Sequence, residues 1–332
     1  MRMIERTTVA GLVALLLPML VGLPASAQLP QGFTPIDGQP VVAALDTALD
    51  GTVFAMGEFA AMSAPPGSTE FRDFPLPTEF INRSIISTYR PLPIDSATVV
   101  FYTPGCYFTD DRGENWTFID RQGSTGAYRD DANKLWGIIF DGISSVDSGL
   151  TWQTIENLEF PLFFVGRNDH LWSRGTSELN YSDDRGESWT RTQDKRREAR
   201  EGAVSDAGRL VGYDKFDLET KESFFFSIAP GEDTAYEGQL PCFAPVAFSP
   251  PFATALNGKC YVALPCGLFE LSEDGTTWTR TTHVPDGAVP EALLFTSDGL
   301  AYLGTDQGLF IGSDVLSVEG ETGWERVELW IE

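Results

Sequence analysis

One eight-residue pattern recurs along this chain and constrains its fold more than any other feature. It consists of a hydroxyl residue, any residue, Asp, any residue, Gly, two further residues and Trp, and it first occurs as TDDRGENW at 109–116. It recurs in full at 145–152 and 182–189, and one residue shorter, as SEDGTTW, at 272–278. The aspartates lie 36, 37 and 90 residues apart, and the last interval leaves room for one further unit of about 45 residues. This regular recurrence indicates a fold built from repeated units.

The residue types of the pattern are those of a turn. Hydroxyl and carboxylate oxygens can accept hydrogen bonds from nearby backbone N–H groups, Gly permits a left-handed backbone, and Trp can cover the turn. A catalytic acid is needed once in an active site, whereas this Asp recurs, so we predict a structural role for the motif. The predicted structural residues are Thr109, Asp111, Gly113, Trp116, Ser145, Asp147, Gly149, Trp152, Ser182, Asp184, Gly186, Trp189, Ser272, Asp274, Gly275 and Trp278.

A second repeated feature predicts strands. Short turn sequences, each followed by an apolar, β-rich run, occur at 50–51, 95–96, 130–133, 168–169, 206–208, 257–258 and 298–299. Asn-Gly, Asp-Gly and related pairs favour tight hairpins. Each unit therefore has four antiparallel strands, A to D in chain order, with the tryptophan motif between C and D. The predicted fold is an all-β, seven-bladed β-propeller, with six or eight blades as alternative counts.

Closure of such a ring requires a contact between the first and last blades, because an open ring would leave sheet edges exposed. Two segments can supply the outermost strand of the last blade. They are GFTPI at 32–36 and WERVELWI at 324–331, and the sequence does not choose between them.

The N-terminal segment has the features of a secretory signal. Arg2 and Arg6 precede a short apolar run, and the small residues of ASA at 25–27 follow it, so we expect cleavage after Ala27. The expected organisation is a signal peptide at 1–27 and a single propeller domain at 28–332, secreted or periplasmic, with no membrane span after signal removal.

The charge balance limits the choice of partners. The chain has a formal net charge of −25, and because its first 27 residues contain two Arg and one Glu, the remainder carries −26. So acidic a protein repels nucleic acid, and we expect no nucleic-acid partner. The one dense basic segment, KRREAR at 195–200, is interpreted as a solvated loop, with docking of an acidic partner as the alternative.

The motif resembles the Asp-box, or BNR repeat, of β-propellers. Proteins with this repeat include sialidases, sortilin-like receptors, xyloglucan-cleaving glycosidases and photosystem II assembly factors. The resemblance implies a structural hairpin between strands C and D and is weak for function, because these families act differently on one fold. It also implies two faces. The A–B and C–D turns form what we call the turn face. The B–C turns and the links between blades form the mouth face, where the related enzymes act.

Candidate ligand-binding residues are expected on the mouth face. Two facing carboxylates would suit a glycosidase, and Asp141, Glu178, Glu291 and Asp306 are placed there. A sialidase would need an arginine cluster and a tyrosine nucleophile with a glutamate partner, and no Arg-Ile-Pro tripeptide is present. The candidate ligand-binding residues are Tyr102, Asp141, Arg174, Glu178 and Asp306.

The cysteines predict one crosslink. Cys242 precedes strand A of the sixth unit and Cys266 lies in its B–C turn, so both belong to the mouth face. Cys260 is expected near the opposite face, and Cys106 belongs to the second unit. A disulfide needs nearby Cα atoms, so Cys242–Cys266 is the favoured pair.

No metal or cofactor is expected, since the chain has only two histidines and no Gly-rich phosphate loop. We therefore expect an exported, non-catalytic propeller that binds or assembles with a protein or polysaccharide partner. The alternative is a glycoside hydrolase, of exo-glycosidase or sialidase-like type, acting through the mouth carboxylates. The sequence does not decide whether the protein is an enzyme.

Overall fold

The chain divides into two compact units, Met1–Thr34 and Pro35–Glu332, and every residue described below belongs to the second. The expected signal peptide and the segment 32–36 lie outside the described residues. The computed structural model describes residues 41–57, 61–76, 91–102, 106–120, 127–129, 135–138, 141–145, 151, 153–159, 162–166, 168–174, 178–194, 202–217, 219–220, 222–242, 249–313, 315–316 and 323–327.

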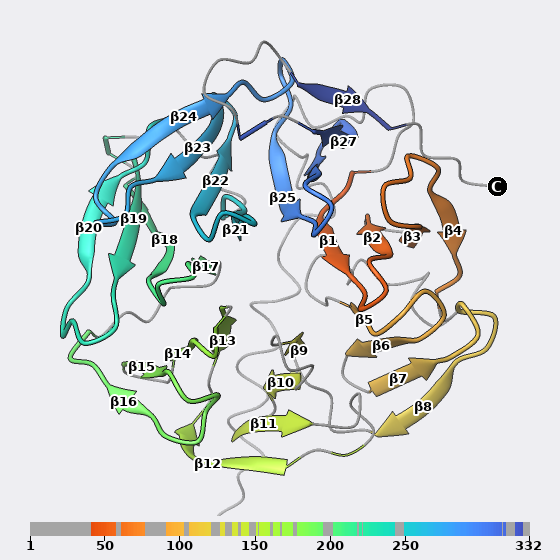
Figure 1. Cartoon of the computed structure of the whole chain (residues 1–332), viewed down its shortest axis with the longest axis horizontal. Coiled ribbons are helices and arrows are strands. Elements are labelled where there is room, and N and C mark those ends of the chain that lie inside the picture. The colour runs from red at the N-terminus through yellow and green to blue at the C-terminus, as the bar shows by residue number, and fades with distance from the viewer. Residues whose placement is uncertain are drawn as a thin grey trace, which may run out of the picture. The chain divides into compact units, whose positions relative to one another are not determined.

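Every regular element in these ranges is a β-strand (Figure 1). The strands form seven four-stranded antiparallel sheets, each from four strands that are consecutive in the chain. The first strands, A, are β1 (Ala44–Thr47), β5 (Pro91–Pro93), β9 (Ala127–Arg129), β13 (Leu162–Val165), β17 (Gly202–Val204), β21 (Phe252–Thr254) and β25 (Pro290–Phe295). The second strands, B, are β2 (Val53–Met56), β6 (Val99–Tyr102), β10 (Leu135–Ile138), β14 (Leu171–Arg174), β18 (Leu210–Asp217), β22 (Cys260–Leu264) and β26 (Ala301–Thr305).

The third and fourth strands complete each sheet outward from the second. The third strands, C, are β3 (Ala61–Ala64), β7 (Cys106–Thr109), β11 (Asp141–Ser145), β15 (Leu179–Ser182), β19 (Glu222–Ile228), β23 (Gly267–Leu271) and β27 (Gly308–Gly312). The fourth strands, D, are β4 (Arg72–Phe74), β8 (Thr117–Asp120), β12 (Gln153–Glu159), β16 (Thr190–Arg191), β20 (Tyr236–Gln239), β24 (Trp278–Thr282) and β28 (Trp324–Arg326).

The first strands contact one another in sequence. β1 contacts β5, and the series continues through β9, β13, β17 and β21 to β25, which contacts β1 again. The chain is thus a β-propeller of four-stranded antiparallel blades, as predicted. The turn sequences at 50–51, 95–96, 168–169, 206–208, 257–258 and 298–299 each join strands A and B of one sheet. The turn at 130–133 lies outside the described residues.

The apolar core lies between adjacent sheets, because each blade buries both of its faces. One cluster joins β22 and β23 to β25–β27, and another joins β17–β19 to β21–β23. The second strand often contributes the largest buried side chain to these layers. The fully buried aromatic residues on second strands are Phe54, Trp136, Trp172, Tyr261 and Tyr302.

The first and last sheets meet through packing and a hydrogen bond. Val42, Val53 and Met62 pack with residues of β26 and β27. The N–H of Val42 donates to the carbonyl of Thr305 at 3.0 Å. The outer strand of the last sheet is Trp324–Arg326, so the C-terminal candidate for this position is the one that pairs with β27.

Candidate functional site

The turn at 109–116 joins β7 to β8, and its side chains hydrogen-bond to its own backbone. The Thr109 hydroxyl donates to Asp111 Oδ1 at 2.8 Å and accepts from the N–H of Gly113 at 3.1 Å. Asp111 Oδ1 also accepts from the N–H of Asn115 at 2.9 Å. Arg112 and Gly113 have φ values of 63° and 82°, the left-handed conformation that Gly adopts without strain. The motif therefore closes a hairpin on itself.

The same bonds recur in the turn at 182–189, between β15 and β16. The Ser182 hydroxyl donates to Asp184 at 2.8 Å and accepts from the N–H of Gly186 at 2.8 Å. Asp184 accepts from the N–H of Ser188 at 2.9 Å and from its hydroxyl at 2.6 Å. In the copy at 145–152, Asp147, Gly149 and Trp152 lie outside the described residues.

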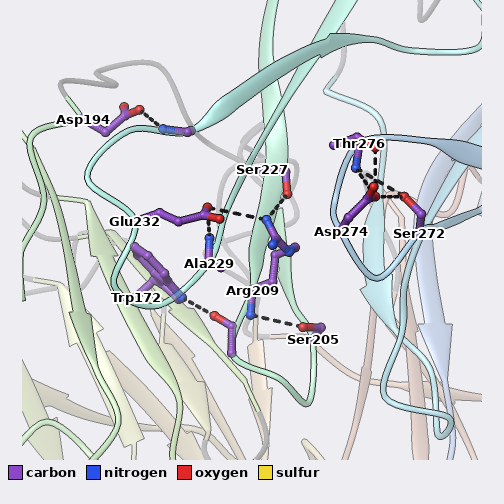
Figure 2. Close-up of polar contacts among 12 residues, drawn as sticks. Trp172, Asp194, Ser205, Arg209, Ser227, Ala229, Glu232, Ser272, Asp274 and Thr276 are labelled. Atoms are coloured by element: carbon purple, nitrogen blue, oxygen red, sulfur yellow. Dashed lines mark hydrogen bonds and ion pairs between the residues drawn. The ribbon is translucent and has the colours of Figure 1, made fainter.

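The shortened copy keeps the bond between its first hydroxyl and its carboxylate. Ser272 donates to Asp274 Oδ1 at 2.6 Å, and Thr276 donates to the same oxygen through its N–H at 3.1 Å and its hydroxyl at 2.8 Å. Figure 2 shows these three residues beside Arg209. The deletion is accommodated by a single left-handed residue, Gly275, at φ 76°.

The three motif carboxylates are stabilised in their charged form. Hydrogen bonds from Asn115 and Thr109 lower the pKa of Asp111 below its usual value. Bonds from Ser188 lower the pKa of Asp184. Bonds from Ser272 and Thr276 lower the pKa of Asp274. A carboxylate held this way is a poor proton donor near neutral pH, which fits a structural role.

The motif tryptophans pack on the preceding sheet. The Trp116 ring lies 6.3 Å from that of Phe74, and its Nε1 donates to the carbonyl of Pro75 at 3.0 Å. The Trp189 ring likewise lies 6.5 Å from that of Trp136.

These rings are only half-buried, whereas Trp136 is fully buried. The motif tryptophans therefore cover their turns, as predicted, while part of each side chain remains accessible to solvent.

Two turns without the motif use a Pro-Gly pair at the same place in the blade. Pro66-Gly67 lies between β3 and β4, and Pro230-Gly231 lies between β19 and β20. Gly67 and Gly231 have φ values of 69° and 81°. The Pro-Gly pair is the sequence signal of these turns, which lack the aspartate and tryptophan of the motif.

Arg209 secures the second of these turns (Figure 2). Its guanidinium donates to the Ser227 hydroxyl at 3.1 Å and lies 3.6 Å from Glu232 Oε2. Glu232 in turn accepts from the N–H of Ala229 at 2.7 Å, as the aspartate does in the motif. A mostly buried arginine therefore stabilises the turn between β19 and β20 in place of the serine–aspartate pair.

Neighbouring A–B turns on the turn face are hydrogen-bonded to each other. The N–H of Ser96 donates to Asp50 Oδ2 at 2.9 Å, which joins the first two sheets. Asn168 Nδ2 donates to the Asp206 carbonyl at 3.3 Å, and the N–H of Asp206 donates to the carbonyl of Gly258 at 2.9 Å. Much of the polar backbone of this face is thus already paired within the protein.

The candidate ligand-binding residues lie at the mouth-face ends of their strands and come from four sheets, with Arg174 and Glu178 in the same one. Tyr102 ends β6, Asp141 begins β11 and Arg174 ends β14. Glu178 immediately precedes β15, and Asp306 lies in the turn between β26 and β27. They therefore lie around the mouth face, on four of the seven sheets.

Glu178 is engaged by a cation. Its Oε1 lies 2.6 Å from Nε of Arg191, an exposed residue of the outer strand β16. This ion pair directs Glu178 toward the outer strand of its own sheet, so it is less suited to hold a ligand.

Asp306 is instead paired with a second acid, Glu291. Glu291 is partly buried in β25, where the register with β26 shifts between Pro290 and Ala292. Burial, and then the charge of Asp306, raise the pKa of Glu291 to about 7. Burial also raises the pKa of Asp306, against a hydrogen bond from the N–H of Val289 at 2.8 Å. An acid that retains its proton near neutral pH can donate it, so this pair is a candidate for proton transfer on the described mouth face.

A tyrosine–glutamate pair also exists, but it lies inside the protein. Tyr261 donates to Glu270 Oε2 at 2.5 Å and accepts from Asn257 Nδ2 at 2.8 Å. Lys259 binds the other carboxylate oxygen at 2.6 Å. Tyr261 is fully buried, and burial raises its pKa, so its oxygen can neither reach a substrate nor ionise readily. This pair serves structure rather than nucleophilic catalysis.

The favoured cysteine pair is a disulfide. Cys242 and Cys266 are joined with their Cα atoms 6.5 Å apart. Cys260 is a buried free thiol in β22, and burial raises its pKa to about 12. The disulfide ties the link before the sixth sheet to that sheet's B–C turn, on the mouth face.

The described ranges contain neither a metal-binding cluster nor a membrane-spanning helix. No group of three or more His, Cys, Asp or Glu side chains is arranged to hold a metal ion. No helix there has the length and apolarity needed to cross a membrane.

Comparison with known proteins identifies a shared fold. No family model matches the sequence, and no curated protein matches it. Among solved structures, the chain is similar to virginiamycin B lyase from Staphylococcus aureus, with a TM-score of 0.57, 11% identity, and coverage of 83% of this chain and 94% of that chain.

Two other similar structures differ in function from the lyase and from each other. The GH74 xyloglucanase from Xanthomonas campestris gives a TM-score of 0.58 at 12% identity, covering 86% of this chain and 54% of that chain. The extracellular domain of BT4673 from B. thetaiotaomicron gives 0.54 at 10% identity, covering 82% of this chain and 38% of that chain. At such low identity the similarity establishes the β-propeller and leaves the activity open.

Proposed function

We propose that this protein is an exported Asp-box β-propeller of seven blades that binds a protein or glycan partner on its mouth face. The observation that carries the proposal is the contrast between faces. The turn face has its backbone groups and motif carboxylates engaged in internal hydrogen bonds. The mouth face holds Glu291 and Asp306, whose carboxyl groups are perturbed by burial. Binding sites combine an apolar lining with a few placed polar groups, and residues with perturbed pKa values are often among them.

The seven-blade count and the closed ring form part of this proposal. They are supported by the seven sheets and by the contact series that returns from β25 to β1. Assignment to the Asp-box repeat is supported by the hydroxyl–aspartate bonds in three copies of the motif. Export is supported by the sequence of residues 1–27 alone. Mass measurement of the protein from the outer compartment of its host tests export, because cleavage after Ala27 leaves Gln28 as the first residue.

Binding is tested with a glycan array and a pull-down from the host's cell envelope. The wild type is compared with Glu291→Gln and Asp306→Asn, and with Glu325→Gln as a matched control on the exposed outer strand β28 of the same sheet. We expect at least one ligand whose affinity falls at least tenfold in both mouth variants and is unchanged in the control. If both mouth variants bound the ligand with unchanged affinity, the binding surface would lie elsewhere on the protein.

The second candidate function is glycoside hydrolysis. It is favoured by one observation, the raised pKa of Glu291, since a general acid must hold a proton near its working pH. The buried position of Tyr261 argues against the sialidase version of this chemistry. Xyloglucan and aryl glycosides are the test substrates. Turnover that falls at least a hundredfold in Glu291→Gln, with Glu325→Gln unchanged, would establish the enzyme; absence of turnover on the whole panel supports the binding protein.

A further inference from the structure

The mouth-face end of the β25–β26 hairpin connects the last sheet to the first. The N–H of Asp306 donates to the Val289 carbonyl at 3.2 Å, and Asp306 Oδ1 accepts from the N–H of Val289 at 2.8 Å. The adjacent residue, Thr305, accepts the hydrogen bond from Val42 that joins the two sheets. Asp306 thus holds the end of the hairpin one residue away from the ring-closing bond.

Glu291 lies at the same end, two residues after Val289. It occupies the point where the β25–β26 register shifts, so its backbone does not continue the regular ladder. Its side chain is partly buried, and the charge recorded as acting on it is that of Asp306. Glu291 and Asp306 therefore follow directly on the paired residues Pro290 and Thr305, at the end of the hairpin that the Val289–Asp306 bonds close.

Other charged and titratable groups surround this end of the hairpin. Arg326 of β28 donates to the Gln307 carbonyl at 3.1 Å. His283 and Asp286, in the link that precedes β25, are both exposed. Asp46, the acidic residue of β1, lies near the A–B turn at the opposite end of its strand. The described strand β21 contributes no charged residue.

We propose that ionisation of both Glu291 and Asp306 loosens the Val289–Asp306 end of the hairpin, so that closure between the first and last sheets depends on pH. With one proton present, one carboxyl group is neutral and the pair is compatible with burial. Loss of that proton to solvent places two negative charges together, and separation of the hairpin end is the movement that relieves their repulsion. This inference does not depend on the proposed binding function.

Amide hydrogen exchange measured at single residues between pH 5.5 and 8.5, corrected for the intrinsic effect of pH, tests the proposal. In the wild type we expect the protection of the Val42, Val289 and Asp306 amides to fall about tenfold between pH 6 and pH 8. Glu291→Gln should keep that protection constant across the range. Glu325→Gln should behave as the wild type.

Asp306→Asn provides an independent second variant, because its amide oxygen can still accept from Val289 while the like charge is removed. It should also abolish the dependence on pH. The proposal is overturned if wild-type protection is constant, if either mouth variant retains the wild-type fall, or if all amides lose protection together, which would indicate global unfolding.

Discussion

The two faces of the propeller use the same functional group in opposite ways. On the turn face, hydrogen bonds from nearby backbone and side-chain donors lower the pKa values of Asp111, Asp184 and Asp274. On the mouth face, burial raises those of Glu291 and Asp306. The first arrangement uses a carboxylate as a fixed acceptor. The second leaves a carboxyl group whose charge can change.

This contrast determines in which direction a change of pH alters the stability that each face contributes to the folded state. A lowered pKa stabilises the folded state above the ordinary pKa, and that contribution is lost as the pH falls through the lower, folded-state value. A raised pKa stabilises the folded state at low pH, and that contribution is lost as the pH rises through the folded-state value. The turn face should therefore govern stability in acid, and the mouth face should govern it near neutrality.

The largest expected effect comes from matched glycine substitutions on the two faces. A Cβ on Gly186, at φ 75°, would lie 2.4 Å from Cη2 of Trp136. A Cβ on Gly287, at φ 74°, would meet only the flexible end of Gln307 at 3.4 Å. We expect Gly186→Ala to destabilise by about 2–5 kcal/mol and Gly287→Ala by about 1–2 kcal/mol, since both are strained but only the first is overpacked. Denaturant unfolding measures both, and equal losses would show that the turn face is no more tightly packed.

The next largest effect concerns the disulfide that crosslinks the mouth face. The Cys242–Cys266 crosslink spans 24 residues of sequence. Replacing both cysteines with serine should cost roughly 3 kcal/mol of unfolding free energy. Hydrogen exchange should show the lost protection near the B–C turn of the sixth sheet, with the hydrogen-bonded turns of the opposite face unchanged. A loss of protection spread evenly over both faces would contradict the view that the two faces are stabilised independently.

The dependence of stability on pH should change when Glu291 is neutralised. The pKa of Glu291 rises from 4.5 to about 7 on folding, so the wild type should lose about 2–3 kcal/mol of stability as the pH rises through that interval. Glu291→Gln should remove this decrease and keep the loss of stability below about pH 4 that lowered carboxyl pKa values produce. Urea unfolding from pH 3 to 8 measures the loss of stability in acid and the loss near neutral pH. If the variant lost as much stability near neutral pH as the wild type does, Glu291 would not be the cause of that loss.

The smallest expected effect concerns Tyr302, a buried tyrosine near the turn face whose hydroxyl differs from the hydrogen-bonded groups of that face. Tyr302 and Tyr261 occupy corresponding places on β26 and β22, yet the buried hydroxyl of Tyr302 has no hydrogen-bond partner. Ile311 stands opposite Tyr302 where Glu270 stands opposite Tyr261.

We expect Tyr261→Phe to cost about 1–2 kcal/mol, because Glu270 and Asn257 lose a partner, and Tyr302→Phe to change stability by less than about 0.5 kcal/mol or to increase it. Thermal unfolding compares them. A large cost for Tyr302→Phe would reveal a partner for its hydroxyl, such as an ordered water.

The repeated features of the fold were predictable because they depend on local sequence. A hydroxyl and an aspartate two residues apart make the same bond at Thr109, Ser182 and Ser272. Asp-Gly and Asn-Gly pairs marked the A–B turns, and the strand order followed from their spacing. The placement of Cys242 and Cys266 required only strand direction.

The remaining features depend on contacts between sheets, which no local pattern encodes. Trp136 and Trp172 are fully buried although they lack the motif, because the second strand of a blade lies between two neighbours. Glu291 is an acid within the apolar run of 290–295, but its pKa is raised by its burial in the folded protein and then by the charge of Asp306, and neither is visible in the local sequence. The ion pair that engages Glu178 likewise depends on Arg191 of the outer strand.

The construction of each sheet from four consecutive strands has a consequence for how such a protein can evolve. Because no described sheet borrows a strand from a distant part of the chain, one sheet corresponds to one continuous stretch of coding sequence. Duplication or loss of that stretch would add or remove a whole blade and leave the internal pairing of every other blade intact. The number of blades can thus vary in a lineage through single genetic events, with adjustment confined to the packing between neighbours.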